Sequence, residues 1–108
     1  MELFVKCKII EDFNDASGCA KYYCEILLTV RAATNGEVSN IIQHESSFSV
    51  SVLNSHGYEI TVDGLDAVYV KYGQRVTLGQ ILGKLSNSGT ALISVNKDGK
   101  ICNPNIFF

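Results

Sequence analysis

The stretch VYVKYGQRVTLGQILG, residues 68–83, decides the fold of this chain. Apolar residues alternate along two short runs, a pattern typical of half-buried β-strands. Gly73 and Gly79 join the runs, and each is followed by Gln at a point where a tight turn needs the conformational freedom of glycine. The stretch therefore predicts a strand, turn, strand unit of a β-barrel, and VRAATNGEV at residues 30–38 is a matching partner upstream.

The rest of the chain continues this β pattern. Strand-like runs are predicted at residues 3–10, 22–31, 37–43, 47–53, 58–62, 68–71, 81–85 and 91–96. Turn signals separate them, among them Asn-Gly at 35–36 and Asp-Gly at 63–64. We therefore expect an all-β, antiparallel barrel-sandwich in a single domain, residues 1–108. Residues 30–108 would form its core, and residues 1–29 would add N-terminal strands and a loop.

Composition and charge exclude several classes of protein. Hydrophobic residues make up 46% of the 108 residues and charged residues 19%, which favours a folded chain over a disordered one. The net charge is −2 with scattered basic residues, so we expect no nucleic-acid partner. No apolar run reaches the roughly 18 to 20 residues of a membrane span. The N-terminal segment MELFVKCKII is typical of a strand and not of a signal peptide, so the protein is intracellular unless an export signal lies outside this sequence.

The four cysteines do not have the spacing of a zinc ribbon or a redox pair. A disulfide between Cys19 and Cys24 is one interpretation for an exported chain. The other, which we favour, is that Cys7, Cys24 and Cys102 are small apolar core residues of strands. The polar segment 11–22 lacks the glycine and terminal Glu of a calcium loop and is interpreted as a solvated loop.

From Val30 to the C-terminus the chain resembles the LytM/lysostaphin-type zinc endopeptidases, a family built on the duplicated hybrid motif. The resemblance is carried by the first strand and turn, by a V-x-x-G-Q-x-V-x-x-G-Q-x-x-G pattern and by an Asn-Pro exit: Val30, Ala32, Gly36, Val38, His56, Gly57, Val70, Gly73, Gln74, Val76, Gly79, Gln80, Ile81, Gly83, Asn103 and Pro104. It implies the fold of that family.

The same resemblance implies that the family's zinc site is missing. Two of its histidine positions, in the His-x-His ligand motif, fall on Thr90 and Leu92, and a further catalytic histidine falls on Gly64. The family's remaining ligand pair, a His and an Asp, has no match, because residues 20–28 contain neither. The chain has only two histidines, His44 and His56, which are interpreted as loop and turn residues. We therefore expect a pseudoenzyme that has no catalytic residues and binds no metal and no cofactor.

Two other architectures resemble this one. Glucose-type IIA domains of the sugar phosphotransferase system share the fold, but their two active histidines fall on Ser46 and at or beside Asp63. Lipoyl and biotinyl domains need a lysine at a hairpin tip, and Lys71, Lys84 and Lys97 do not stand in that context.

The function that we expect is a catalytically inactive LytM-like module that binds or scaffolds a protein or peptide, as in cell-envelope complexes of the family. The alternative is a IIA-like phosphotransferase or an unusual hydrolase with a rebuilt site. The candidate binding groove consists of Asp63, Gly64, Tyr69, Tyr72 and Leu92. The aromatic C-terminus, residues 106–108, is a further candidate contact, since aromatic side chains are enriched at interfaces.

Overall fold

The computed structural model describes residues 8–11, 20–23, 29–32, 34–85, 90–98 and 100–102. Every regular element in these residues is a β-strand, as the sequence predicts. The strands are β1 (Lys8–Glu11), β2 (Ala20–Tyr23), β3 (Thr29–Arg31), β4 (Gly36–Gln43), β5 (Phe48–Leu53), β6 (Tyr58–Val68), β7 (Arg75–Val76), β8 (Ile81–Leu85), β9 (Thr90–Lys97) and β10 (Lys100–Cys102). Among the described residues no helix could cross a membrane.

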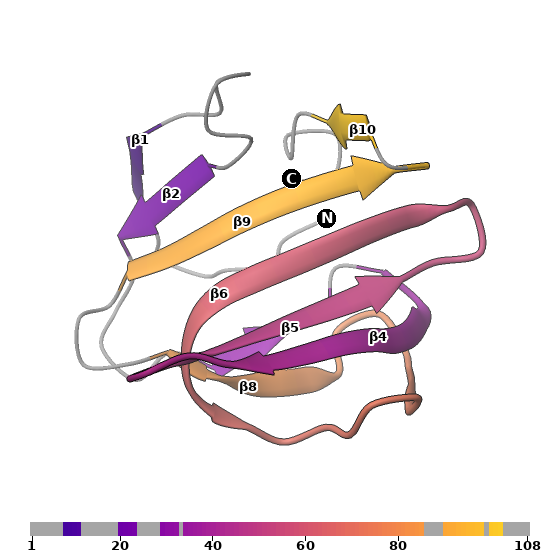
Figure 1. The fold of residues 1–108 in the computed structure, drawn as a ribbon, viewed down its shortest axis with the longest axis horizontal. Helices are drawn as coiled ribbons and strands as arrows, with labels where there is room; N and C mark the ends of the chain where they lie inside the picture. The colour runs from indigo at the N-terminus through magenta and orange to yellow at the C-terminus, as the bar shows by residue number, and fades with distance from the viewer. Residues whose placement is uncertain are drawn as a thin grey trace.

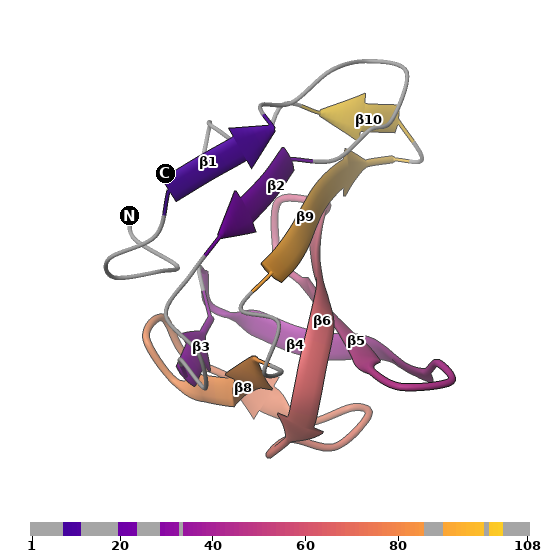
Figure 2. The same ribbon diagram turned by 90° about the vertical axis from the view of Figure 1, so that its left-hand side faces the viewer.

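All strand pairs are antiparallel, and they form one connected sheet in the order β1-β2-β9-β6-β5-β4-β7. Outside this path, β10 pairs with β9, and β8 pairs with both β3 and β6. Figure 1 shows β9, β6, β5 and β4 side by side, with β8 beneath them. Figure 2 shows β6 descending from β9 to the layer that contains β3 and β8. The sheet therefore curls back on itself and encloses a core.

The long strand β6 connects the two layers, and it corrects one prediction. The Asp-Gly pair at 63–64 was expected to be a turn between two strands, but β6 runs through it from Tyr58 to Val68. The pairing with β5 shifts there by one residue, from Ser49↔Asp63 to Phe48↔Leu65, so Gly64 is the extra residue of a bulge. Gly64 has a φ of 99°, which glycine adopts without a steric penalty. The bulge bends β6 so that its last residues pair with β8.

The other strand predictions mostly hold. The predicted runs 37–43, 47–53, 81–85 and 91–96 match β4, β5, β8 and β9 to within one residue at each end. The expected strand at 68–71 is wrong, because β6 ends at Val68, and the two-residue strand β7 was not in the list of predicted runs. The described parts of the runs 3–10 and 22–31 lie in β1, β2 and β3. Cys7, Cys19, Cys24, the centre of the 11–22 loop and the aromatic C-terminus lie outside the described residues.

The two Gly-Gln pairs of the opening stretch form two turns with the same hydrogen bonds. Gln74 N donates to Lys71 O, and its side-chain Oε1 accepts from Lys71 N at 3.0 Å. Six residues later Gln80 N donates to Thr77 O, and its Oε1 accepts from Thr77 N at 3.1 Å. Gly73 and Gly79, with φ of 82° and 88°, complete the turns. The two turns thus repeat one pattern of hydrogen bonds, as expected for a duplicated motif.

Each Gly-Gln turn exchanges two backbone hydrogen bonds with one upstream residue. Gly73 N donates to Val38 O while Val38 N donates to Gln74 O, both at 2.9 Å. Ala32 makes the equivalent pair of bonds with the second turn: Gly79 N donates to Ala32 O, and Ala32 N donates to Gln80 O. The upstream partner segment predicted at residues 30–38 therefore binds both turns.

The core lies between the layers and consists of aliphatic side chains that alternate along the strands. In β6, Ile60 and Val62 face this core, whereas Thr61 and Asp63 face away from it because successive strand residues point to opposite sides. The buried hydrophobic residues are Val30, Ala32, Val38, Val50, Val52, Ile60, Val62, Leu65, Val70, Val76, Leu82, Leu85, Ile93 and Val95. The opposite side of the sheet carries polar residues, among them Ser49, Ser51, Thr61 and Asp63, and we call it the polar face.

Candidate functional site

Strand register brings three of the five candidate groove residues together on adjacent strands. Asp63 of β6 is the cross-strand partner of Leu92 of β9, and Gly64 follows Asp63 directly. On its other side Asp63 pairs with Ser49 of β5, and Ser49 pairs with Ile42 of β4. Directly opposed residues of an antiparallel sheet point to the same side, so Ile42, Ser49, Asp63 and Leu92 form one row across the polar face.

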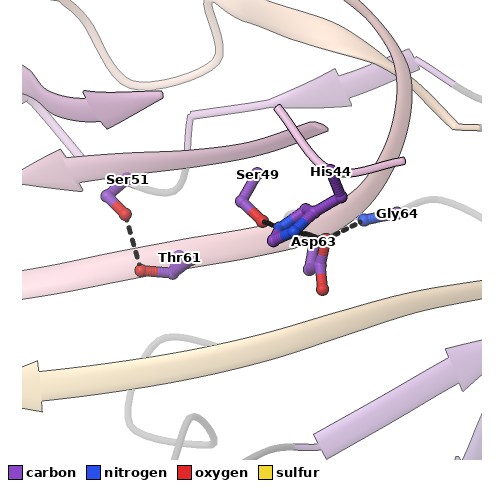
Figure 3. Close-up of polar contacts among 6 residues, drawn as sticks. All are labelled: His44, Ser49, Ser51, Thr61, Asp63 and Gly64. Atoms are coloured by element: carbon purple, nitrogen blue, oxygen red, sulfur yellow. Dashed lines mark hydrogen bonds and ion pairs between the residues drawn. The ribbon is translucent and has the colours of Figure 1, made fainter. Parts of the chain in front are cut away.

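At the centre of this row lies a polar cluster of His44, Ser49 and Asp63 (Figure 3). The Ser49 hydroxyl donates to Asp63 Oδ1 at 2.9 Å, and the His44 ring nitrogen Nε2 lies 2.8 Å from the same hydroxyl oxygen. Nε2 is also 3.6 Å from Asp63 Oδ1. The backbone N–H of Gly64 donates to that oxygen at 2.8 Å, so Asp63 also holds the bulge of β6.

Proton positions in the cluster follow from these bonds. Ser49 has one hydroxyl proton and gives it to Asp63, so the hydroxyl can only accept from His44. This arrangement corresponds to the imidazole tautomer that carries a proton on Nε2. In a nucleophilic triad the hydroxyl and the carboxylate bind different ring nitrogens, and the imidazole takes the proton from the hydroxyl. Here both approach the same nitrogen, and Ser49 is only 6% exposed. The geometry is that of a structural network and not of an activated nucleophile.

A second polar pair lies beside the cluster. Ser51 of β5 and Thr61 of β6 are cross-strand partners whose hydroxyl oxygens are 2.7 Å apart (Figure 3). Ser51 is 5% exposed, and among the described residues no buried side-chain nitrogen or oxygen lacks a hydrogen bond. The buried side-chain polar groups described on this face therefore have hydrogen-bond partners within the chain.

Two of the three positions predicted to match the family's histidines have no side-chain atom that could bind a metal. Gly64 has no side chain, and Leu92, which is 37% exposed, carries only a hydrocarbon. Thr90 begins β9, two residues before Leu92. Among the residues that the structure describes, no group of three His, Cys, Asp or Glu side chains is placed to hold a metal ion. His56 lies in the exposed 54–57 turn, as predicted, and its backbone N–H donates to Asn54 Oδ1.

The two tyrosines of the candidate groove lie elsewhere along the chain. Tyr69 follows β6, is 55% exposed, and donates its backbone N–H to Leu82 O. Tyr72 is 75% exposed in the first Gly-Gln turn and lines a cavity of about 590 Å³ together with Arg75 and Leu53. None of the other four groove residues lines that cavity. The structure thus places Asp63, Gly64 and Leu92 side by side on β6 and β9. The two tyrosines do not belong to this row of residues.

Sequence reasoning missed the His44–Ser49–Asp63 cluster, because it depends on pairing between distant residues. The signal that could have found it is the hairpin between β4 and β5. His44 N donates to Ser47 O at 2.8 Å, which leaves a loop of only two residues, 45–46, and sets His44 near Ser49. Register with β6 then brings Asp63 beside both.

Removal of the Ser49 hydroxyl is expected to destabilise the fold. In Ser49→Ala the side chains of Asp63 and His44 both lose a hydrogen-bond partner, which corresponds to a loss of about 1 to 3 kcal/mol in the free energy of unfolding. Ser55→Ala is the matched control, since Ser55 is exposed and the change should stay within about 0.5 kcal/mol. Urea unfolding followed by circular dichroism measures both, and equal midpoints for the two variants would contradict the role given to Ser49.

Comparisons with known proteins rest on structure. No protein-family profile matches the sequence, and no curated protein is significantly similar to it. Among solved structures, a chain of the SpoIIIAH and SpoIIQ complex superposes with a TM-score of 0.82 at 19% identity, over 95% of this chain and 93% of that chain.

Two further matches are chains much longer than this one. A zinc-containing peptidase from Vibrio cholerae has a TM-score of 0.80 at 18% identity and covers 89% of this chain. Lysostaphin has a TM-score of 0.77 at 15% identity and covers 94%. This chain spans 35% of the Vibrio cholerae chain and 49% of the lysostaphin chain. At these identities the comparisons bear on architecture, and with the curled antiparallel sheet and its two Gly-Gln turns they establish that the chain has the LytM-type fold.

Proposed function

We propose that this chain is a LytM-fold domain without peptidase activity that binds or scaffolds a protein or peptide partner. One observation carries the proposal: Gly64, Thr90 and Leu92, which we predict to stand at the family's histidine positions, lie on the paired strands β6 and β9. The loss covers the whole constellation, because the chain has only two histidines.

The chemistry of a zinc peptidase explains why this observation matters. A catalytic zinc needs three protein ligands and one open position for the water that attacks the peptide bond. Gly64 and Leu92 supply no donor atom, and the Nε2 of His44 is already bonded to the Ser49 hydroxyl. Asp63 is a carboxylate on this face that could bind a metal, but its Oδ1 already accepts from Ser49 and Gly64.

A binding role is supported by the structural relatives and by the surface. The matching chain from the SpoIIIAH and SpoIIQ complex shares the fold over 93% of its own length. That chain was solved in a complex of two proteins. On this chain, Leu92 is a partly exposed apolar residue beside the carboxylate of Asp63, which is 35% exposed. We propose that Asp63, Gly64 and Leu92 form the centre of the binding surface, with Tyr69 and Tyr72 as more distant contacts. A place in a cell-envelope assembly is part of this proposal.

The proposal predicts that the purified protein, dialysed against a zinc salt, retains fewer than about 0.1 zinc ions per chain by elemental analysis, since structural and catalytic sites bind zinc stoichiometrically. It also predicts no cleavage of glycine-rich peptides. Both measurements are made on the wild-type chain and on His44→Ala, which removes the ring nitrogen nearest Asp63.

The alternative of a rebuilt site is favoured by one observation, the approach of His44 to the Asp63 carboxylate at 3.6 Å. Stoichiometric zinc, peptide cleavage, or phosphoryl transfer from a phosphorylated carrier protein that disappears in His44→Ala would overturn the pseudoenzyme proposal and support this alternative. The same zinc content and the same lack of activity in both proteins would support the proposal.

A further inference from the structure

Among the residues that the structure describes, the outer edge of β4 is paired along only half of its length. Gly36 and Glu37 pair with β7, and Val38 exchanges two hydrogen bonds with the first Gly-Gln turn. At Ser39 the register with β5 shifts by one residue, which marks a bulge. Beyond the bulge, no strand in the described part of the chain pairs with the outer side of residues 40–43.

The hairpin geometry identifies which backbone groups face outward on this edge. His44 N donates to Ser47 O, so these two residues form a hydrogen-bonded pair, and every second residue along β4 does the same. Asn40 and Ile42 therefore bond to Ser51 and Ser49 of β5. Ile41 and Gln43 alternate with these hydrogen-bonded residues. Their N–H and C=O groups therefore point away from β5, toward the outer side of β4.

This part of the edge lacks two of the features that protect sheet edges from pairing, charged residues and proline, and a bulge lies beside it at Ser39. Natural edge strands carry lysine, proline or inward-facing charges where they would otherwise pair with another chain. Residues 39–43 read SNIIQ and contain no charged residue and no proline. Ile42 is 45% exposed and lies on the polar face, where it adds an apolar contact beside the outward-pointing backbone groups.

We propose that a second copy of this chain pairs with the outer edge of β4 about a two-fold axis at Ile42. Ile41 of each copy would then oppose Gln43 of the other, and each of these pairs exchanges two backbone hydrogen bonds. Ile42 of one copy would face Ile42 of the second as a non-hydrogen-bonded pair, in which side chains approach closely. The sheet would continue through both copies.

A second copy suits this edge because the register is self-complementary. An isologous interface places the same residues on both sides, so like charges near the axis would repel each other. Here the pairs nearest the axis are Ile42 with Ile42, Ile41 with Gln43 and Asn40 with His44, and none opposes two carboxylates or two lysines. The neutral edge thus avoids the repulsion expected between two chains of net charge −2. The inference goes beyond the proposed function and does not depend on it.

Sedimentation equilibrium of the full chain tests the inference. For so small an interface we expect a dissociation constant of about 10 µM to 1 mM, with the mass rising from 11.8 kDa toward twice that value over this range. Ile42→Lys places two ammonium groups face to face and should raise the dissociation constant at least about tenfold. Leu78→Lys, at a residue 54% exposed in the second Gly-Gln turn, is the matched control and should dimerise like the wild type.

A second variant separates loss of pairing from loss of folding. Gln43→Pro removes an outward N–H that makes no bond to β5, so circular dichroism should show an intact fold while dimerisation is weakened at least about tenfold. A wild-type mass of 11.8 kDa throughout the concentration range would overturn the proposal. So would dissociation constants in Ile42→Lys and Gln43→Pro equal to that of Leu78→Lys.

Discussion

Gly83→Ala is expected to lower the free energy of unfolding by about 3 kcal/mol or more, because a methyl group at this position would overlap neighbouring backbone atoms. Gly83 is buried in β8, where it pairs with Val30 of β3 on one side and Val68 of β6 on the other. A Cβ there would overlap the carbonyl oxygen of Ala67 and lie 3.3 Å from Leu65 Cδ1. The carbonyl belongs to the backbone, so it cannot swing aside as a flexible side chain could.

The control for this prediction is a glycine that is needed for a different reason. Gly79→Ala puts a methyl group in open space, since nothing lies within 4 Å, but forces an L-residue to a φ of 88°. That conformation costs roughly 1 to 2 kcal/mol. Guanidinium unfolding of both variants gives the two values. A Gly83→Ala protein no less stable than Gly79→Ala would show that β6 and β8 can separate, contrary to the close approach described above.

The sequence made the fold predictable because its strongest signals are local. Gly73 with Gln74 and Gly79 with Gln80 each close a turn within four residues, so the hydrogen bonds that define the motif can be inferred from spacing alone. The same holds for the turn at Gly57, which has a φ of 85°. The strands beside these turns followed from the alternation of apolar residues, since one side of each strand must be buried.

Local signals failed where pairing between distant segments decides the conformation. Asp63 and Gly64 are a turn signal in isolation, but β5 and β9 pair with Asp63 on both sides and keep the chain extended. The glycine then serves as a bulge that turns β6 toward β8. The short strand β7 was missed for a related reason, because its two residues are a strand only through pairing with Gly36 and Glu37.

The candidate site was predictable only in part for the same reason. The resemblance predicts that Gly64, Thr90 and Leu92 stand at histidine positions, but it does not predict which residues lie beside them. His44 was interpreted as an isolated loop residue, and Asp63 as a simple turn residue. The structure gives both a partner through Ser49, which lies in the strand predicted at residues 47–53 but was not predicted to contact either of them.

Leu65→Ala is expected to cost about 2 to 5 kcal/mol, the other large effect in this protein. Leu65 is fully buried and is the first residue after the bulge, where β6 leaves the register of β5 and enters that of β8. It pairs with Phe48 on one side and Leu85 on the other, so truncation leaves a cavity at the junction of the two layers. Leu78→Ala, at an exposed leucine, should change stability by no more than about 0.5 kcal/mol.

Combining Leu65→Ala with Gly83→Ala tests which atoms make this junction close-packed. The Cβ of an alanine at 83 would contact both the Leu65 side chain and the Ala67 carbonyl, but only the first contact disappears when Leu65 is truncated. Because the backbone obstacle remains, we expect the double variant to be less stable than either single variant in the same guanidinium series. A double variant as stable as Leu65→Ala alone would mean that the leucine side chain, and not the backbone of β6, dictates glycine at position 83.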